Sequence, residues 1–286
     1  MSLPLNQNLK LNLNPNLNQF AILVLSFNHP ELTARAVHSA LKLHDKVFLL
    51  HNGSEIKFVE KLKASFPQIE HLHLEKNRGY SGGVNFGLHE VFKTFTWVIL
   101  LTNDCLMQNL PKIPAAPSFI APHIRIQKSE RTDSLGGAFI PHQGRIFHCK
   151  TTADFTFAKH KYIPGSAFLL HHEVFKITGP FDESLGTYWE DVDFSQRAVA
   201  LNQQLSVDAD WWLTHGRGKT CHKDRHYTLY LYQRNRKRIS RKYTERSYQP
   251  ILFLNLWAGW LKMATRLLLR SRRADLGILY RAIADS

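Results

Sequence analysis

Acidic side chains gather in one short segment, and their types and spacing suit acid–base chemistry. The segment covers residues 189–193 (WEDVD), and Asp182 lies a few residues before it. One carboxylate there could remove the proton of an acceptor hydroxyl while another orients the acceptor. Glu190 and Asp191 are adjacent and would point about 100° apart on a helix, which favours separate roles. The alternative is structural, because the helix dipole stabilises acids at a helix start whatever their function.

A further carboxylate, Asp104, follows closely after the apolar run WVILLT (97–102). At the end of a buried strand a carboxylate is costly unless it meets a cation, a hydrogen-bond network or solvent. A divalent cation, Mg²⁺ or Mn²⁺, would suit it, since Mg²⁺ often takes one or two carboxylates together with phosphate oxygens of a substrate. The alternative is an Asp that caps the following turn.

Two polar segments could contact phosphate groups. Loop 77–83 (NRGYSGG) precedes a predicted helix, so its backbone amides and the helix N-terminus could approach a phosphate or a nucleoside. Glycines in such a turn also serve backbone geometry alone. Segment 215–222 (HGRGKTCH) contains two histidines, and an imidazole there could bind a metal or a diphosphate. The chain has 16 histidines, so chance placement is the competing explanation.

Short apolar runs that alternate with helical patterns would position these side chains. Strands are predicted at 20–27, 46–50, 69–74 and 97–102. Helices are predicted at 30–43, in the stretch that ends at Phe66 and at 84–95, with a loop at 75–83. Such alternation is typical of a mostly parallel sheet with helices on both faces. The sequence therefore predicts an α/β, Rossmann-like fold.

Polar residues follow the predicted strands, at Asn28, 52–54, 77–83 and 103–104. The carboxyl ends of parallel strands meet at one edge of a sheet, and ligands bind there in such folds. We therefore expect these segments to gather along one edge and form a ligand site.

The pattern changes after a proline-rich break at 111–117. The next forty residues, with glycines between apolar runs, indicate a small insertion of antiparallel strands and loops. Beyond it, the sequence predicts a strand near 167–170, a short helix, a helix at 190–201 and a strand near 205–207. The remainder from Arg225 is predicted to be mainly helical.

Basic residues dominate the charge: 37 Lys and Arg against 23 Asp and Glu give a net charge of +14. This excess indicates a polyanionic partner such as a nucleoside diphosphate, an anionic lipid or nucleic acid. It is concentrated toward the C-terminus, where residues 217–246 hold eleven Lys or Arg but only Asp224 and Glu245. Nucleic acid is the weakest of these candidates, because no base-reading motif accompanies the charge.

The cysteine content and the apolar segments indicate the cellular compartment in which the protein is expected to work. Three cysteines without metal-type spacing favour a reducing, cytoplasmic environment. Residues 1–19 do not resemble a secretory signal and are expected to form a low-complexity leader. Residues 251–269 are apolar but interrupted by Asn255, Lys262 and Arg266, so no transmembrane helix is predicted. The mixture of Trp, Leu and basic residues at 251–273 fits either an interfacial helix on the inner face of the cell membrane or a packed terminal helix.

The order of several short segments resembles the family 2 glycosyltransferases with the GT-A fold, especially the bacterial rhamnosyltransferase-like subgroup. Between residues 20 and 240 the matching segments are ILVLSFN, HNGS, NRGYSGGVNFGL, LLTND, IPGSAFLLHHEVFKITGPFDE, YWEDVDFSQRA, HGRGKT and YQRN. Each is weak by itself, whereas the set in this order is specific. The resemblance implies an inverting hexosyltransferase that moves a sugar from a nucleoside-diphosphate donor to a carbohydrate or lipid-linked acceptor. Cell-surface polysaccharide or glycolipid synthesis would be its setting.

On the acceptor side, the resemblance makes Asp191 the candidate base and gives Glu190 a part in holding the acceptor. Trp189 and Asp182 are assigned to acceptor binding beside them.

On the donor side, the resemblance makes Asp104 the metal-binding acid, with His215 as a further contact to metal or diphosphate. Arg234 and Asn235 match a motif of less understood role. The donor-binding residues are Asn28, Asn52, Ser54, Asn77, Gly79, Gly82, Gly83, Asn85, Asn103 and Lys219.

The expected organisation is a catalytic domain over 20–224, followed by a basic, amphipathic helical region over 225–286. Within the domain, 20–110 would be the nucleotide-sugar half and 111–224 the acceptor half.

Two residues depart from the family pattern. His51 stands where an acidic residue usually precedes the Asn-x-Ser turn, and Thr102 replaces the first acid of Asp-x-Asp. These departures keep open the alternative of a catalytically impaired nucleotide-sugar-binding protein. A sugar-phosphate nucleotidyltransferase is a second alternative, because it could also use an α/β nucleotide domain with a metal carboxylate.

Overall fold

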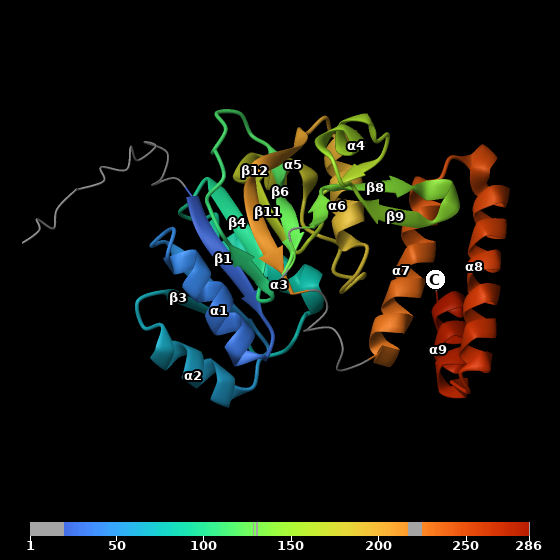
Figure 1. Cartoon of the computed structure of the whole chain (residues 1–286), viewed down its shortest axis with the longest axis horizontal. Coiled ribbons are helices and arrows are strands. Elements are labelled where there is room, and N and C mark those ends of the chain that lie inside the picture. Colours follow the sequence, from blue (N-terminus) through green and yellow to red (C-terminus); the bar gives the residue numbers. More distant parts are fainter. Residues whose placement is uncertain (1–19, 128, 130, 217–224, 286) are drawn as a thin grey trace, which may run out of the picture.

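A large mixed sheet forms the centre of the molecule (Figure 1). In this computed structural model, residues 20–127, 129, 131–216 and 225–285 are described, so the expected leader at 1–19 lies outside them. The strands are β1 (Phe20–Ser26), β2 (Val47–Asn52), β3 (Glu70–Leu74), β4 (Trp97–Thr102), β5 (Cys105–Met107), β6 (Phe119–Ile126), β7 (Thr132–Leu135), β8 (Gly137–Ile140), β9 (Arg145–His148), β10 (Lys161–Tyr162), β11 (Ala167–His171) and β12 (Leu205–His215).

The order of strands in the main sheet is β3-β2-β1-β4-β11-β6-β12-β5, with β7 beside β6. The four predicted N-terminal strands pair in parallel, as do β6 and β12. β11 runs antiparallel to both of its neighbours, β4 and β6. The mostly parallel sheet predicted from the sequence is therefore confirmed.

Helices cover both faces of this sheet. They are α1 (Pro30–Leu41), α2 (Ile56–Ser65), α3 (Gly79–Val91), α4 (Thr152–Phe157), α5 (His172–Thr178) and α6 (Glu190–Ala200). One face of β1 packs against α1 through Ile22 and Val37, whereas the other face packs against α3 through Leu23 and Leu88. Strand β1 is buried along its whole length because both of its faces are covered.

The region after Pro117 contains the expected antiparallel strands. A second small sheet has the order β10-β8-β9, and a 3-10 turn, η2 (Pro141–Gln143), lies between β8 and β9. Strand β12 pairs with β6 along most of its length, but the register shifts between Asp208 and Trp212. Asp208 pairs with Pro122 and Trp212 pairs with His123, so β12 carries a bulge that β6 lacks.

The C-terminal region is helical, as expected, and lies at the opposite end of the molecule from β3 (Figure 1). It contains α7 (Arg225–Tyr243), a 3-10 turn η4 (Arg246–Tyr248), α8 (Gln249–Leu269) and α9 (Arg273–Ala284). An ion pair between Arg225 of α7 and the buried Asp275 of α9 joins two of these helices at 3.1 Å. None of the helices described here has the length and apolarity needed to cross a bilayer.

Two sequence expectations differ from the structure. Helix α3 begins at Gly79, five residues before the predicted start, so most of the glycine-rich segment is helical. Gly83 lies so close to Asn52 that a Cβ atom would come within 2.8 Å of the amide nitrogen, and this close packing allows the helix to begin early. Strand β12 continues to His215, well beyond the predicted end near 207.

We expect burial of His51 to make the stability of the fold depend on pH. His51 is fully buried, and its Nε2 lies 3.0 Å from Nδ1 of His71. Burial and the nearby charges of His71 and His73 lower the pKa of His51 from 6.5 to about 4. The unfolded chain therefore binds a proton at a higher pH than the folded chain does. The free energy of unfolding should fall as pH drops through this window, by up to about 3 kcal/mol.

Urea denaturation at pH ~7.5 and pH ~4.5 would measure this loss. His51→Asn should show a smaller difference between the two conditions than the unchanged chain. An equal difference in both proteins would show that His51 does not cause the effect.

Candidate active site

A cavity of about 480 Å³ opens where the ends of β4 and β12 meet the starts of α6 and α7. Asp104 and His215 line it from the strand side, and Glu190 and Asp191 line it from α6. The other lining residues are Tyr80, Thr102, Ile146, Gly165, Ser166, Thr187, Tyr188, Trp189, Arg225, Thr228 and Tyr232. The fold thus brings the proposed metal pair and the proposed acid–base pair to one cavity. Helix α7, from the region predicted as a C-terminal appendage, supplies part of its wall.

A strained turn at Tyr188 and Trp189 precedes Asp191 and positions its side chain at the cavity. Tyr188 and Trp189 both have a φ of 72°, in the left-handed region that non-glycine residues rarely adopt. Each such residue costs on the order of 1–3 kcal/mol, so surrounding contacts must hold the turn. The Asp191 carboxylate then accepts the N–H of Gly165 on Oδ2 at 3.0 Å and that of Val192 on Oδ1 at 2.8 Å. Its position is therefore fixed from both sides.

Asn235 of α7 is fully buried and holds this turn. Its amide Nδ2 donates to the backbone carbonyls of Leu185, Thr187 and Tyr188 at 2.9, 3.1 and 2.8 Å. The neighbouring Arg234 donates to the Leu185 carbonyl at 3.1 Å. These contacts give a structural role to the Arg-Asn pair, whose role the sequence left open.

Glu190 and Asp191 differ in electrostatic environment. Glu190 is buried, and its Oε2 has no hydrogen-bond partner in the described part of the chain. Burial and the adjacent Asp191 raise the pKa of Glu190 well above its usual range. Burial also raises the pKa of Asp191, but the N–H groups of Gly165 and Val192 oppose the rise because they stabilise the carboxylate. A proton bound by the pair is therefore better accommodated on Glu190 than on Asp191, whose ionised form the two N–H groups stabilise.

Tyr80, at the start of α3, supports the same site, although no sequence reasoning singled it out. Its hydroxyl donates to the carbonyl of Gly165, whose own N–H binds Asp191. Its backbone N–H donates to Oγ1 of Thr187 at 3.2 Å, beside the strained turn. The only signal for Tyr80 in the sequence was its place in the NRGYSGG segment.

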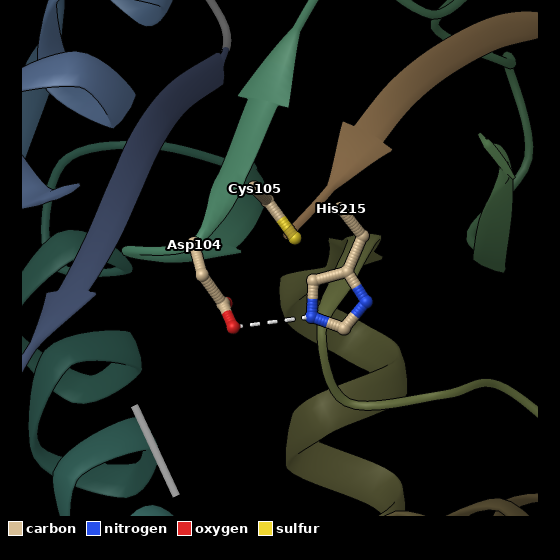
Figure 2. Close-up of side chains that lie close together, drawn as sticks. All are labelled: Asp104, Cys105 and His215. Atoms are coloured by element: carbon tan, nitrogen blue, oxygen red, sulfur yellow. Dashed lines mark ion pairs between the residues drawn. The ribbon is translucent and has the colours of Figure 1, made fainter. Parts of the chain in front are cut away.

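Asp104, Cys105 and His215 form the cluster shown in Figure 2, with their nearest ligand atoms all within 4.8 Å of one another. Asp104 Oδ2 lies 3.3 Å from His215 Nε2. Thr102 Oγ1 donates to Asp104 Oδ1 at 2.8 Å, so the residue that replaces the usual first acid fixes the second one. The Cys105 thiol is fully buried and donates to the Ser166 carbonyl at 3.3 Å. Burial raises the pKa of Cys105, which makes this thiol an unsuitable ligand.

The other two side chains of the cluster, Asp104 and His215, have ligand atoms that fit a divalent cation. A carboxylate oxygen and an imidazole nitrogen suit Mn²⁺, whereas Mg²⁺ prefers oxygen ligands alone. Burial alone would lower the pKa of His215, but its contacts with Asp104 and Asp133 raise it to about 9. Burial would raise the pKa of Asp104, but His215 and Thr102 hold it below its usual value. Asp104 and His215 are the residues that would hold the ion, and His215 would lose its proton when the ion binds.

Asp133 of β7 is a site residue that the sequence did not reveal. It is buried, and its Oδ2 lies 3.7 Å from Nδ1 of His215, on the side away from Asp104. A carboxylate at the second nitrogen of a metal-binding histidine fixes the ring and its tautomer. We therefore expect Asp133→Asn to weaken Mn²⁺ binding by about tenfold or more.

Calorimetric titration with Mn²⁺ would measure this loss without any substrate. Asp210→Asn is the matched control, because Asp210 lies on the same strand as His215 but is exposed. Equal Mn²⁺ affinity in Asp133→Asn and in the control would show that Asp133 does not orient the histidine.

Asn28, Asn52 and Ser54, three of the predicted donor residues, lie at strand ends, outside the residues that line the cavity. Asn28 and Ser54 join β1 to β2, since the Asn28 N–H donates to Ser54 Oγ at 2.9 Å. Asn52 holds the next loop, with its amide donating to the Gly79 carbonyl at 2.8 Å and to Asn77 Oδ1 at 3.3 Å. These side chains connect the strand ends to one another. Lys219 lies outside the described residues.

Other predicted donor residues also make internal contacts. The Asn103 amide donates to Thr33 at 3.2 Å, and the Asn85 amide donates to the Phe181 carbonyl at 2.9 Å. Gly82 packs against Arg78, where a Cβ atom would come within 2.6 Å of the arginine Cβ. These contacts keep α3 and the loops close to the sheet edge.

The acids of the 182–193 segment separate into different environments. Asp182 lies outside the cavity lining, and its carboxylate accepts the Ser184 N–H at 2.9 Å. Asp193 is fully buried and pairs with Arg197 at 2.8 Å and Lys242 at 2.6 Å. Only Glu190 and Asp191 of this segment's acids reach the cavity.

Similarity to known proteins agrees with this geometry. The model of the family described as glycosyl transferase family 2 matches residues 21–178. No curated protein matches the sequence.

Two solved structures have similar folds. One is the crystal structure of GalNAc-T7 with UDP, GalNAc and Mn²⁺, with a TM-score of 0.62 and 16% identity. The similarity covers 82% of this chain and 50% of that chain, so this chain spans about half its length. The other is the mannosyltransferase PcManGT from Pyrobaculum calidifontis in complex with GDP-Man and Mn²⁺, with a TM-score of 0.53 and 11% identity over 93% of this chain and 85% of that one. The shared fold is GT-A.

Proposed function

The chain belongs to glycosyl transferase family 2 and is a glycosyltransferase, and we propose that it moves a hexose from a nucleoside-diphosphate sugar to an acceptor hydroxyl with inversion. The observation that supports this proposal most directly is that one cavity is lined by two pairs of side chains with different chemistry. Asp104 and His215 could hold a cation beside a diphosphate, and Asp191 with Glu190 could accept a proton from an acceptor.

In the proposed reaction the acceptor oxygen attacks the anomeric carbon of the donor. The new carbon–oxygen bond forms as the bond from that carbon to the diphosphate breaks, and the nucleoside diphosphate leaves. Asp191 takes the hydroxyl proton and later releases it to solvent. One displacement from the side opposite the leaving group inverts the anomeric configuration.

Asp191 suits the role of base because its carboxylate is fixed and two backbone N–H groups stabilise its ionised form. Burial raises its pKa, which increases its basicity. Glu190, as a neutral acid, could donate a hydrogen bond to the acceptor. The indole N–H of Trp189 also has no partner among the described residues and lies at the same cavity. Buried polar atoms of this kind are usually satisfied in a complex, which supports acceptor binding by Glu190 and Trp189.

Asp104 and His215 would hold Mn²⁺ or Mg²⁺, and such an ion would act as a Lewis acid that neutralises charge on the leaving diphosphate. Thr102 and Asp133 fix the two ligands through their contacts. The similar structures that contain Mn²⁺ support this cofactor.

For the donor, we propose that the nucleoside lies along the strand ends, beside Asn28, Asn52 and Ser54. The start of α3 and Asn103 would border it, and Lys219 would contact the diphosphate. Asp182 is proposed to act from outside the cavity, near the incoming acceptor.

The rhamnosyltransferase-like subgroup is the finer assignment that we propose, on the strength of the matching segments and the single acid Asp104 where Asp-x-Asp is usual. The setting would be polysaccharide or glycolipid synthesis at the cytoplasmic face of a membrane, with a carbohydrate or lipid-linked acceptor.

A panel of nucleoside-diphosphate sugars with Mn²⁺ tests the proposal. A matching donor should raise the melting temperature and should release nucleoside diphosphate when a sugar acceptor is added. Proton NMR of the product should show the inverted anomer. Donor binding without transfer would favour the impaired binding protein, and pyrophosphate release from a nucleoside triphosphate would favour the nucleotidyltransferase. Either result would overturn the proposal.

A further inference from the structure

Helix α8 has two apolar faces, and only one of them is covered. Leu252, Leu256 and Trp260 are buried against the neighbouring C-terminal helices. A different set of apolar side chains faces outward at helical spacing, among them Leu254 and Leu261, which are 66% and 68% exposed. The exposed apolar face of α8 consists of Ile251, Phe253, Leu254, Trp257, Leu261, Leu268 and Leu269.

Such a surface is unusual for a chain that meets only water. Single exposed leucines are common, whereas contiguous apolar patches mark sites of interaction. The residues recur at intervals of three, four and seven, so they form one stripe along the helix and not scattered exposures. Trp257, half-exposed within the stripe, has the amphipathic ring that prefers a membrane–water interface.

Basic residues border this stripe on one side. Lys262 and Arg266 are four residues apart on one flank of α8, Arg270 follows the last residue of the helix, and all three are exposed. None of the three forms an ion pair with a described residue. The sequence from Arg246 to Arg273 contains no Asp or Glu, so nothing acidic offsets their charge locally. An apolar stripe with a basic flank is the arrangement that binds anionic lipid at its surface.

We propose that the exposed apolar face of α8 and its basic flank bind the surface of an anionic phospholipid bilayer, with α8 lying in the plane of the interface. We choose phospholipid as the partner and not a second copy of this chain because of the positive charge of the flank. Two copies of this face would bring like charges together, whereas anionic phospholipid attracts them. Such contact deepens the proposed function, since it would bring the enzyme to a lipid-linked acceptor. The binding itself needs no catalytic activity.

Sedimentation of the full chain with vesicles tests this surface. We expect the protein to bind vesicles that contain phosphatidylglycerol, to bind phosphatidylcholine vesicles much more weakly, and to lose binding as salt rises. The double variant Leu254→Ser and Leu261→Ser should bind at least tenfold more weakly. Its polar serines replace two leucine side chains that would be transferred from water into the bilayer interface on binding. The triple variant Lys262→Gln, Arg266→Gln and Arg270→Gln should lose a factor of roughly one hundred on phosphatidylglycerol only.

Phe157→Ser is the matched control, since Phe157 is 86% exposed on α4 and lies outside the proposed surface. It should leave vesicle binding unchanged. Absence of binding to phosphatidylglycerol vesicles, or equal binding by all variants, would overturn the proposal. Dimerisation in solution that the double Ser variant abolishes would also overturn it, because the face would then be a self-contact. Release of nucleoside diphosphate with a soluble acceptor, measured in the same variants, separates failure of this proposal from failure of the proposed function.

Discussion

Asp191→Asn is expected to lower kcat for sugar transfer by about 10³-fold and to leave the Kd for the donor and for Mn²⁺ nearly unchanged. Asparagine has nearly the same size, and its single amide oxygen can keep one of the two N–H contacts that Gly165 and Val192 make with Asp191. It cannot take the acceptor proton. Single-turnover kinetics and calorimetry would separate the chemical step from binding.

Two neighbouring substitutions serve as controls for this prediction. Glu190→Gln should reduce kcat by less than about tenfold, because burial favours the neutral form of Glu190 and glutamine is also neutral and can donate a hydrogen bond. Asp193→Asn should mainly destabilise the fold, because it breaks the buried contacts with Arg197 and Lys242. Transfer by Asp191→Asn at a rate close to that of the unchanged chain would exclude Asp191 as the base.

Asn235→Ala is expected to reduce the free energy of unfolding by about 2 kcal/mol and kcat by about 10²-fold. The substitution leaves the carbonyls of Thr187 and Tyr188 without this donor, and each unsatisfied buried carbonyl costs on the order of 1 kcal/mol or more. The Leu185 carbonyl still accepts from Arg234 and from the Thr187 N–H. The left-handed turn would then relax, and a displacement of about 1 Å at the base is enough for such a loss of rate.

Asn255→Ala provides the comparison for Asn235. The amide of Asn255 on α8 also donates to a backbone carbonyl, that of His142 in the turn η2 at 3.0 Å, but Asn255 does not contribute to the cavity lining. Its removal should lower stability modestly and leave kcat of the folded protein unchanged. If Asn235→Ala lowers stability but leaves kcat intact, the turn does not position Asp191.

Much of the fold could be predicted because strong apolar runs determine it. The segments at 20–26 and 97–102 are buried nearly throughout, and their continuous apolar character is typical of strands covered on both faces. The meeting of polar residues at the strand ends follows from parallel topology alone. This is why Asp104 could be placed at the sheet edge from the sequence.

Other parts were inaccessible to sequence reasoning for physical reasons. The segment from Asp208 to Trp212 breaks the alternation of a strand with a bulge, so the true extent of β12 was hidden, and with it the place of His215 opposite Asp104. Asp133 and Asn235 are ordinary polar residues in the sequence. Their roles depend on contacts with residues about fifty or more positions away, which no local pattern records.

The bulge in β12 bears on how chain length can vary among relatives of this protein. Ala209 and Asp210 are exposed and have no partner residues in β6, so gain or loss of a residue there can be absorbed without a change of pairing on either side. Between Trp212 and His215 the register with β6 is continuous. A single insertion in that stretch would turn the imidazole to the opposite face of the sheet. Insertions and deletions should therefore accumulate at the bulge and be absent from the last four residues of the strand.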